Sequence, residues 1–235
     1  MIRKIMGKHA LEEVLKIDSE RLLKVYTCKE EDPLLQRLQN AGIKTIVIPK
    51  NRLFSLVQSE SHQGFVAEVR EREELPLKQF LSSTSEKSLV VLCDSITDPQ
   101  NFGAILRACE CFGVDALVFS KNRNVGLTPV VSKVSVGGSE LVPIITVSNL
   151  VDTLKKFQDA GYFSVAAECH KQSQSLYDFE FPSQTVLIIG AEGKGIQPLL
   201  SKKADCHLEI PMQGCIDSLN VSQATAVFLS HWRRG

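Results

Sequence analysis

The chain has 235 residues, enough for one large domain or two small ones. Hydrophobic residues make up 43% and charged residues 23%, which is ordinary for a globular protein and excludes general disorder. Lys and Arg number 27, and so do Asp and Glu, so a polybasic nucleic-acid-binding protein is excluded but one basic face is not. The basic excess is small and lies at the N-terminus, with 11 basic and 7 acidic residues within 1–54.

Targeting signals and metal motifs are not expected. No apolar run approaches 18 residues, and the start, MIRKIMGKHALEEVL, becomes charged too early for a signal peptide. The seven cysteines have no regular spacing and form no CxxC pair, and the five histidines lack ligand spacing. We therefore expect a reduced, cytoplasmic protein with no metal and no membrane contact.

The first 70 residues alternate helix and strand patterns, which predicts a small α/β domain. Helices are expected over 7–17 and 32–38, and strands over 22–27, 43–48 and 65–69. The following segment is charged, contains Pro and is rich in Ser, so residues 71–87 are predicted to be a linker.

Residues 88–235 are predicted to form a second, larger domain. Strands are expected over 88–93, 116–119, 142–146, 162–167, 185–189 and 207–210, and helices over 101–112, 128–134, 149–160 and 218–232. The first strand, SLVVLC, is almost entirely apolar, as expected for a strand buried on both faces. The alternation predicts an α/β fold with a mostly parallel, doubly wound sheet.

Three polar segments follow strands, at the edge where open parallel sheets bind ligands. In the first, Asn101 is a candidate helix N-cap. Gly103 destabilises a helix by up to about 1 kcal/mol relative to Ala. Its presence in the first turn therefore suggests that it lets a ligand or another backbone approach closely. Arg107 lies one turn later and is predicted to be half-buried beside Glu110.

The second segment contains Gly190, Gly193 and Gly195 directly after an apolar strand. The glycines predict a tight turn with exposed N–H groups. Their spacing differs from the dinucleotide motif G-x-G-x-x-G, but Glu209 lies where a ribose-binding acid would. A nucleotide-dependent oxidoreductase is therefore an alternative, although Pro198 leaves room for only a short helix.

The third segment, LEIPMQGCIDSLNVSQA, runs from a short strand into the last helix. Ser218 is predicted to be the N-cap of that helix. Asn220 and Ser222 would then lie in its first turn, where free N–H groups bind anions. Capping explains Ser218 but not the polar residues that follow it, Asn220 and Ser222.

Together, the three segments resemble the motifs of the SpoU (TrmH) family of RNA 2′-O-ribose methyltransferases, within the SPOUT superfamily. The matching residues are Asn101, Gly103 and Arg107, then Gly190, Glu192 and Gly195, then the run 210–222. The motifs occur in order over about residues 88–232, although 135–140 follow the family pattern only loosely. Residues 7–10 and 61–64 resemble the family's substrate-binding domain, which is similar to the ribosomal protein L30e fold.

The resemblance implies a methyltransferase domain with a C-terminal trefoil knot that binds S-adenosyl-L-methionine, and a homodimer. It implies that the catalytic residues are Asn101, Arg107, Glu192, Ser218 and Asn220. The cofactor-binding residues that it implies are Gly190, Ile210 and Leu219.

The resemblance implies that Arg107 is the group that activates the ribose hydroxyl. Arg has a pKa above 12, so removing its proton at pH 7 costs on the order of 7–9 kcal/mol. Alternatively, Arg107 stays charged, binds the phosphate beside the target ribose and lowers the pKa of the hydroxyl. We favour the second role.

The layout is similar to the members that methylate a guanosine of 23S rRNA, which is the expected RNA partner. The alternatives are a tRNA ribose methyltransferase and a non-catalytic RNA-binding factor in ribosome assembly. The joint presence of Asn101, Arg107, Glu192 and Asn220 argues against loss of catalysis.

Overall fold

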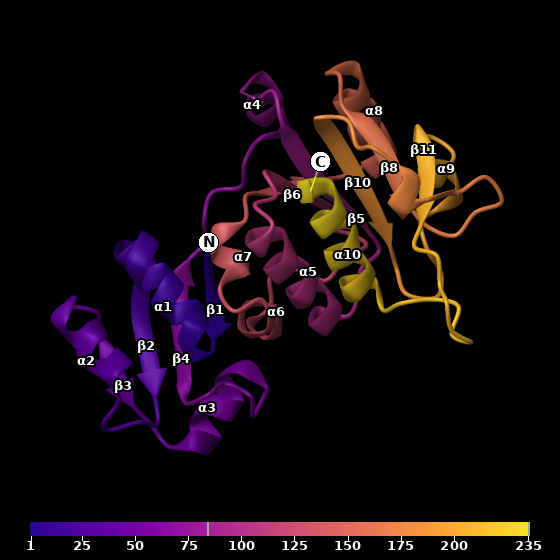
Figure 1. The fold of residues 1–235 in the computed structure, drawn as a ribbon. Helices are drawn as coiled ribbons and strands as arrows, with labels where there is room; N and C mark the ends of the chain where they lie inside the picture. The colour runs from indigo at the N-terminus through magenta and orange to yellow at the C-terminus, as the bar shows by residue number, and fades with distance from the viewer. Residues whose placement is uncertain (84, 235) are drawn as a thin grey trace. The chain divides into compact units, whose positions relative to one another are not determined.

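The computed structural model describes residues 1–83 and 85–234, and the chain divides into two compact units (Figure 1). Unit 1 comprises Met1–Glu73 and Gly126–Leu141, and unit 2 comprises Glu74–Val125 and Val142–Gly235. Each unit has its own sheet and its own apolar core. None of the helices in the described part of the chain is long and apolar enough to cross a membrane.

Unit 1 is built on a mixed sheet of four described strands in the order β1-β4-β2-β3. The strands are β1 (Ile2–Met6), β2 (Leu22–Thr27), β3 (Thr45–Val47) and β4 (Phe65–Arg70). Strand β4 pairs antiparallel with β1 and β2, whereas β2 and β3 are parallel. The predicted strands are confirmed. Strand β1 was not predicted, because its charged residues interrupt the alternation of apolar and polar residues that identifies a strand.

Two of the helices of unit 1 follow from its sequence pattern. The helical elements within residues 1–73 are α1 (Lys8–Ile17), the 3-10 turn η1 (Ser19–Arg21), α2 (Pro33–Asn40) and α3 (Lys50–Val57). Helix α1 buries the apolar stripe Ala10, Leu11 and Val14. Helix α2 begins after Asp32, whose carboxylate accepts a hydrogen bond from the backbone N–H of Leu34 at 2.8 Å. Helix α3 was missed by the pattern analysis.

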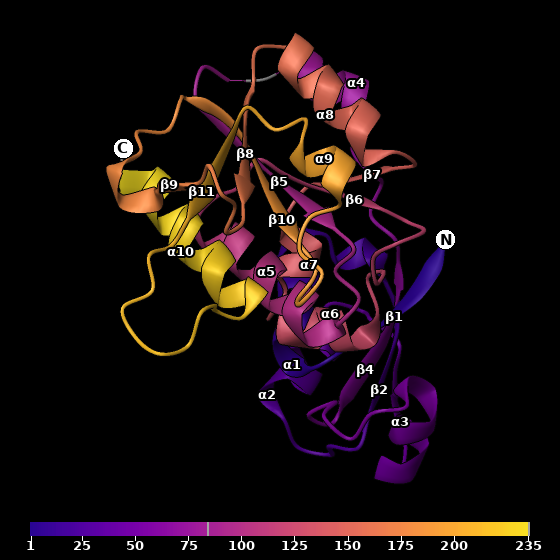
Figure 2. The ribbon, with the colours of Figure 1, turned by 90° about the vertical axis from the view of Figure 1, so that its right-hand side faces the viewer.

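Two short helices from the middle of the chain, α6 (Pro129–Val134) and α7 (Gly138–Leu141), complete unit 1 and lie beside β1 and α1 (Figures 1 and 2). The backbone N–H of Met6 donates to the hydroxyl of Ser132 at 3.2 Å. Glu140 of α7 is only 1% exposed and forms ion pairs with Arg3 and Arg21, the latter at 2.9 Å. Residues 126–141 therefore share the polar and apolar interior of unit 1.

Unit 2 contains a sheet of seven described strands in the order β7-β6-β5-β10-β8-β11-β9, with parallel pairing throughout. Its strands are β5 (Ser88–Asp94), β6 (Ala116–Ser120), β7 (Ile144–Val147), β8 (Phe163–Ala167), β9 (Gln174–Ser175), β10 (Gln184–Gly190) and β11 (Cys206–Glu209). All seven residues of β5 are buried, as its apolar sequence predicts. The predicted parallel α/β fold is confirmed.

Helices cover both faces of this sheet (Figures 1 and 2). They are α4 (Leu77–Ser82), α5 (Pro99–Cys111), α8 (Leu150–Asp159), η2 (Leu176–Asp178), α9 (Pro198–Ser201) and α10 (Val221–Arg234). Residues of α4, α8 and α9 pack with Val90 and Leu92 of β5 in one core cluster. Successive side chains of a strand point to opposite faces, so Val91 lies toward the face that carries α5 and α10. Helices α5 and α10 pack side by side there.

The predicted linker contains a helix. Phe80 of α4 is buried and packs against Phe157, with ring centroids 6.0 Å apart. The sequence pattern does not indicate this helix, because half of its residues are polar and only the face that carries Phe80 is buried. The polar composition therefore does not show that this segment lacks structure.

Candidate active site

The loops after β5 and β10 begin side by side, because these two strands pair in parallel with Gly190 opposite Asp94. Asp94 is fully buried. Its carboxylate accepts two hydrogen bonds from Gln197, one from the backbone N–H of Gln197 at 2.7 Å and one from the Nε2 of Gln197 at 2.5 Å. Asp94 therefore fixes the end of the loop that follows β10 (residues 191–197, called the glycine loop) over the end of β5. Sequence reasoning missed this role, although an acid at the end of an apolar strand was a usable signal.

The glycine loop folds back on itself. A Cβ atom at Gly190 would lie 2.2 Å from the carbonyl carbon of Gly195, so only glycine fits there. Ala191 and Gly195 exchange backbone hydrogen bonds of 2.8 and 3.1 Å across the turn. Gly193 and Gly195 have φ values of +78° and +66°, in the left-handed region that favours glycine. The tight turn alone explains all three glycines.

Three of the predicted site residues, from the first turn of α5, the glycine loop and the residue before α10, form one chain of side-chain hydrogen bonds. Asn220 donates through Nδ2 to Oδ1 of Asn101 at 2.8 Å, and Asn101 donates through Nδ2 to Oε2 of Glu192 at 3.1 Å. The Oδ1 atom of Asn220 accepts from the hydroxyl of Ser222 at 2.6 Å. A carboxylate only accepts, so Glu192 sets the orientation of both amides.

Two predicted helix caps are wrong. Helix α5 begins at Pro99, and its cap is Asp98, which accepts from the N–H of Gln100 at 2.9 Å. The Asn101 side chain is therefore free of capping and available to the chain of amides. Helix α10 begins at Val221, and the side chain of Asn220 accepts from the N–H of Ser222 at 2.9 Å, so Asn220 occupies the cap position. Ser218 lies before the helix, is exposed and donates to Asp217.

Arg107 lies on α5 and is exposed, so the expectation of a half-buried side chain is wrong. No residue in the described part of the chain forms an ion pair or hydrogen bond with its guanidinium, and Glu110 is also exposed. Gly103, one turn earlier, is buried. A guanidinium free of internal partners is available to a phosphate, which it binds through paired N–H groups.

The residues expected to bind the cofactor follow β10 and β11. Gly190 ends β10, Ile210 directly follows β11 and is half-buried, and Leu219 is 40% exposed. Ile216, in the same irregular segment, is 76% exposed. Ile216 and Leu219 therefore leave apolar surface open to solvent in this segment.

Glu209 has a different partner from the one that the oxidoreductase alternative requires. The Cys169 thiol, in the loop after β8, forms a hydrogen bond with Glu209, which together with the charge of this carboxylate raises the pKa of Cys169. The glycine loop is followed only by the four-residue helix α9 (Pro198–Ser201). A dinucleotide-binding turn opens a long helix, so the structure argues against that alternative.

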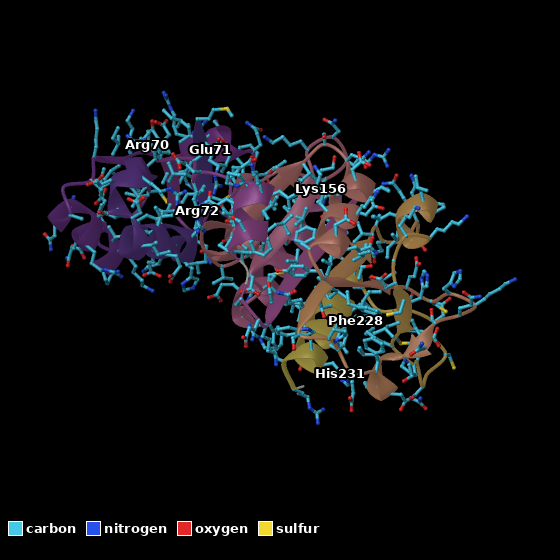
Figure 3. All side chains as sticks on the ribbon, turned by 90° about the horizontal axis from the view of Figure 1, so that it is seen from above. Arg70, Glu71, Arg72, Lys156, Phe228 and His231 are labelled. Atoms are coloured by element: carbon cyan, nitrogen blue, oxygen red, sulfur yellow. The ribbon has the colours of Figure 1, made fainter. Side chains whose placement is uncertain are left out.

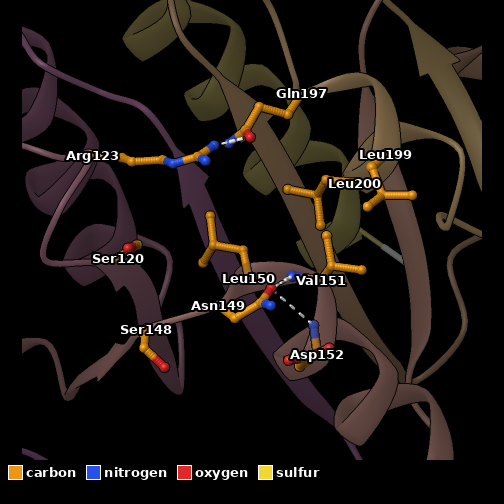
Figure 4. A pocket seen from close by; sticks show the side chains of 10 residues that line it. All are labelled: Ser120, Arg123, Ser148, Asn149, Leu150, Val151, Asp152, Gln197, Leu199 and Leu200. Atoms are coloured by element: carbon orange, nitrogen blue, oxygen red, sulfur yellow. Dashed lines mark hydrogen bonds between the residues drawn. The ribbon is translucent and has the colours of Figure 1, made fainter.

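A hollow of about 350 Å³ lies at the carboxyl ends of β6 and β7 (Figure 4). Arg123 donates there to Oε1 of Gln197, the residue that also binds Asp94. On the other side, Asn149 caps α8 by accepting from the N–H groups of Val151 and Asp152 at 2.9 and 3.3 Å. The Arg123 contact adds a cation connected to the glycine loop, which the sequence motifs did not reveal.

Asn220 has two separable roles, so we expect two variants to divide them. Asn220→Ala should lower the free energy of unfolding by about 1 kcal/mol through loss of the cap, and lower the activity of the site roughly tenfold through loss of the bond to Asn101. Asn220→Asp keeps the cap acceptor but removes the donor to Asn101. It should keep the stability and lower the activity about tenfold, as measured by urea unfolding and by initial rates. Equal activity of Asn220→Asp and the parent would contradict the role of the amide chain.

Comparison with known proteins agrees with this geometry. The SpoU rRNA Methylase family model matches residues 88–230, and the model for RNA 2′-O ribose methyltransferase substrate binding matches residues 4–75. The chain is 36% identical over 237 residues to the 23S rRNA (guanosine-2′-O-)-methyltransferase RlmB of Pasteurella multocida, covering 97% of this chain and 96% of the relative. It is 37% identical over 233 residues to the protein of that name from Yersinia pestis, covering 96% and 94%.

A solved structure shares the fold. The SpoU methyltransferase AviRb from Streptomyces viridochromogenes, in complex with AdoMet, superposes with a TM-score of 0.81 at 23% identity, covering 98% of this chain and 89% of that one. The order of the three motifs, their meeting in one chain of hydrogen bonds and the family matches all agree. The chain therefore belongs to the SpoU rRNA Methylase family.

Proposed function

We propose that the protein transfers the methyl group of S-adenosyl-L-methionine to a ribose 2′-OH of RNA, at a guanosine of 23S rRNA. The chain of hydrogen bonds from Asn220 through Asn101 to Glu192 carries the proposal, because it joins three motifs that are far apart in the sequence. The relatives that match nearly full length are 23S rRNA guanosine methyltransferases by name, which supports this substrate.

The residues of the chain fit the cofactor. The apolar side chains of Ile210 and Leu219 leave surface open at the loops after β10 and β11, where they would hold an adenine. S-adenosyl-L-methionine, when bound, supplies an electrophilic methyl group. The backbone around Gly190 would offer polar groups at the edge of the same surface.

Arg107 would bind the phosphate beside the target ribose and lower the pKa of the 2′-OH by its charge. The exposed guanidinium, without an internal partner among the described residues, supports this role. Asn101 and Asn220 would hold the ribose and Glu192 in one orientation, so that the hydroxyl oxygen is aligned for attack. Ser218, exposed before α10, would contribute a hydroxyl to the same surface.

The finer details of the fold are part of this proposal. The chain passes from β8 to β10, then to β11 on the far side of β8, and returns through α10 to pack on α5. This path supports a trefoil knot in the C-terminal half of unit 2. The mixed four-stranded sheet and flanking helices of unit 1 support an L30e-like, RNA-binding domain over residues 1–70, followed by a connection over 71–87 and the methyltransferase domain over 88–235.

The protein is expected to be a homodimer through α10. Phe228 and His231 both lie on α10 (Figure 3). Phe228 is buried, whereas His231 lines a hollow of about 290 Å³ together with Tyr177, which is 60% exposed. An exposed aromatic beside a hollow is typical of an interface. Light scattering should give twice the chain mass of 26.0 kDa, and Tyr177→Asp should shift the protein toward the single-chain mass. A parent protein of single-chain mass at micromolar concentration would contradict the dimer.

The function is tested with radiolabelled S-adenosyl-L-methionine and purified RNA. Label should enter unmodified 23S rRNA and appear, after nuclease digestion, as 2′-O-methylguanosine. Label in tRNA instead would identify a tRNA methyltransferase. RNA binding without any transfer would identify a non-catalytic ribosome-assembly factor.

A further inference from the structure

A hollow of about 430 Å³ in unit 1 is lined by a set of side chains suited to a nucleotide: Lys50, Asn51, Phe54, Glu60 and His62. They come from the first two turns of α3 and from the turn that precedes β4. All five lie within residues 1–73, so the hollow belongs to unit 1 alone. None belongs to the SpoU motifs of unit 2.

His62 lines this hollow and carries an unpaired ring nitrogen. The residue is 1% exposed, and its Nε2 is buried with no partner among the described residues. Its Nδ1 accepts from the backbone N–H of Gly64 at 3.0 Å, so in the neutral ring the proton is on Nε2. A buried donor without an acceptor is costly, and a ligand with an acceptor atom would remove that cost.

The ring of His62 is held in place by its turn. Gln63 and Gly64 have φ values of +55° and +87°, and the side-chain Oε1 of Gln63 accepts from the N–H of Lys8 at 3.0 Å. Burial, followed by the charge of Lys50, lowers the pKa of His62. The ring is therefore neutral at pH 7 and presents Nε2–H as a fixed donor.

The other residues supply an aromatic face and charges. Phe54 is 41% exposed, although Phe is usually buried, and an exposed aromatic ring is a platform for a nucleobase. Lys50 and Asn51 begin α3 after Pro49, which has no side-chain acceptor for the N–H groups of the first turn. The free N–H groups at the start of a helix, together with a lysine side chain, favour the binding of a phosphate group.

We propose that this hollow binds one unpaired guanine nucleotide of the substrate RNA, with the base stacked on Phe54, its O6 or N7 accepting from Nε2–H of His62, and its N1–H and N2–H₂ donating to Glu60. Guanine is the base that offers two adjacent N–H donors to a carboxylate as well as an acceptor to a histidine. Lys50 binds the adjoining phosphate. The inference rests on the proposed function only for the identity of the RNA.

The test measures binding of the full-length protein, without cofactor, to a labelled uridine 11-mer that carries one central guanosine, by fluorescence anisotropy. Matched probes replace that guanosine with adenosine, cytidine or uridine. We expect the guanosine probe to bind most tightly, and Phe54→Ala to weaken it about 10- to 100-fold, the usual effect of losing one stacking platform. Glu60→Gln should abolish the preference over the adenosine probe.

The controls are Ile17→Ala, which removes an exposed apolar side chain, and Glu30→Gln, which removes an exposed acid, both in unit 1 and outside the hollow. His62→Asn keeps an acceptor for Gly64 but removes the Nε2–H donor, and it should weaken the guanosine probe about tenfold. Equal affinity and base preference in the hollow variants and the controls would overturn the inference. A preference for another base that persists in Glu60→Gln would also overturn it.

Methyl transfer to 23S rRNA is measured separately with the same proteins. If transfer occurs while the hollow variants bind the probes like the controls, the inference fails and the proposed function stands. If no RNA is methylated but Phe54→Ala loses the guanosine probe, the proposed function fails and the binding site stands.

Discussion

Arg107→Ala should lower the rate of methyl transfer by at least about 100-fold and leave the affinity for S-adenosyl-L-methionine within a few-fold of the parent. The reason is the separation of elements: Arg107 lies on α5, whereas the proposed cofactor residues follow β10 and β11. The measurements are initial rates with labelled cofactor and cofactor affinity by calorimetry. Lys156→Ala, which removes an exposed cation from α8, is the matched control and should retain full activity.

Arg107→Lys distinguishes the two roles of the arginine. Lysine keeps the positive charge but loses the planar pair of donors. If Arg107 acts by charge alone, the lysine variant should recover much of the rate with little change in the pH profile. If Arg107 is a base, the variant should be slow and show a new pH dependence. Parent-level activity of Arg107→Ala, or loss of cofactor binding by a folded variant, would contradict the assignment.

Glu140→Gln should lower the stability of unit 1 by about 3–5 kcal/mol, because it leaves two buried arginines without their counter-charge. The side chain of Glu140 is fully buried, and those of Arg3 and Arg21 are only 11% and 8% exposed. Glu13→Gln is the matched control, since Glu13 pairs with Lys16 on the surface, at 26% and 56% exposure. It should change stability by less than about 1 kcal/mol.

Hydrogen exchange measures this effect locally, because the two units need not unfold together. In Glu140→Gln, peptides from residues 1–73 and from 126–141 should exchange faster together, while β5 of unit 2 keeps its protection. Unchanged exchange in both segments of unit 1 would show that the ion pairs with Arg3 and Arg21 do not stabilise it. Faster exchange of 126–141 alone would show that these residues do not unfold with the rest of unit 1.

The same ion pairs bear on truncation of the chain. Removing residues 1–75 would take away Arg3, Arg21 and the backbone of Met6, which are partners of Glu140 and Ser132. Residues 126–141 would then keep a buried acid without a cation. A cut in the chain at this point does not separate unit 1 from the rest, although the composition of 71–87 suggests a boundary there.

The sequence by itself determined the elements with a clear period and the identity of the three polar segments. The apolar run of β5, the stripe of α1 and the glycine turn after β10 depend on neighbouring residues, so their patterns are readable along the chain. Short or charged elements such as β1, α3 and α4 were missed, because one buried face in a polar segment gives a weak period.

Only the tertiary structure decided how the site residues are used. Asn101 was a plausible cap by position, but its partners Glu192 and Asn220 lie 91 and 119 residues away. Likewise, nothing near Glu140 in the sequence indicates Arg3 and Arg21, 137 and 119 residues distant. A buried polar group must find a partner wherever the packed chain brings one, and that choice depends on the contacts of the whole fold and not on local pattern.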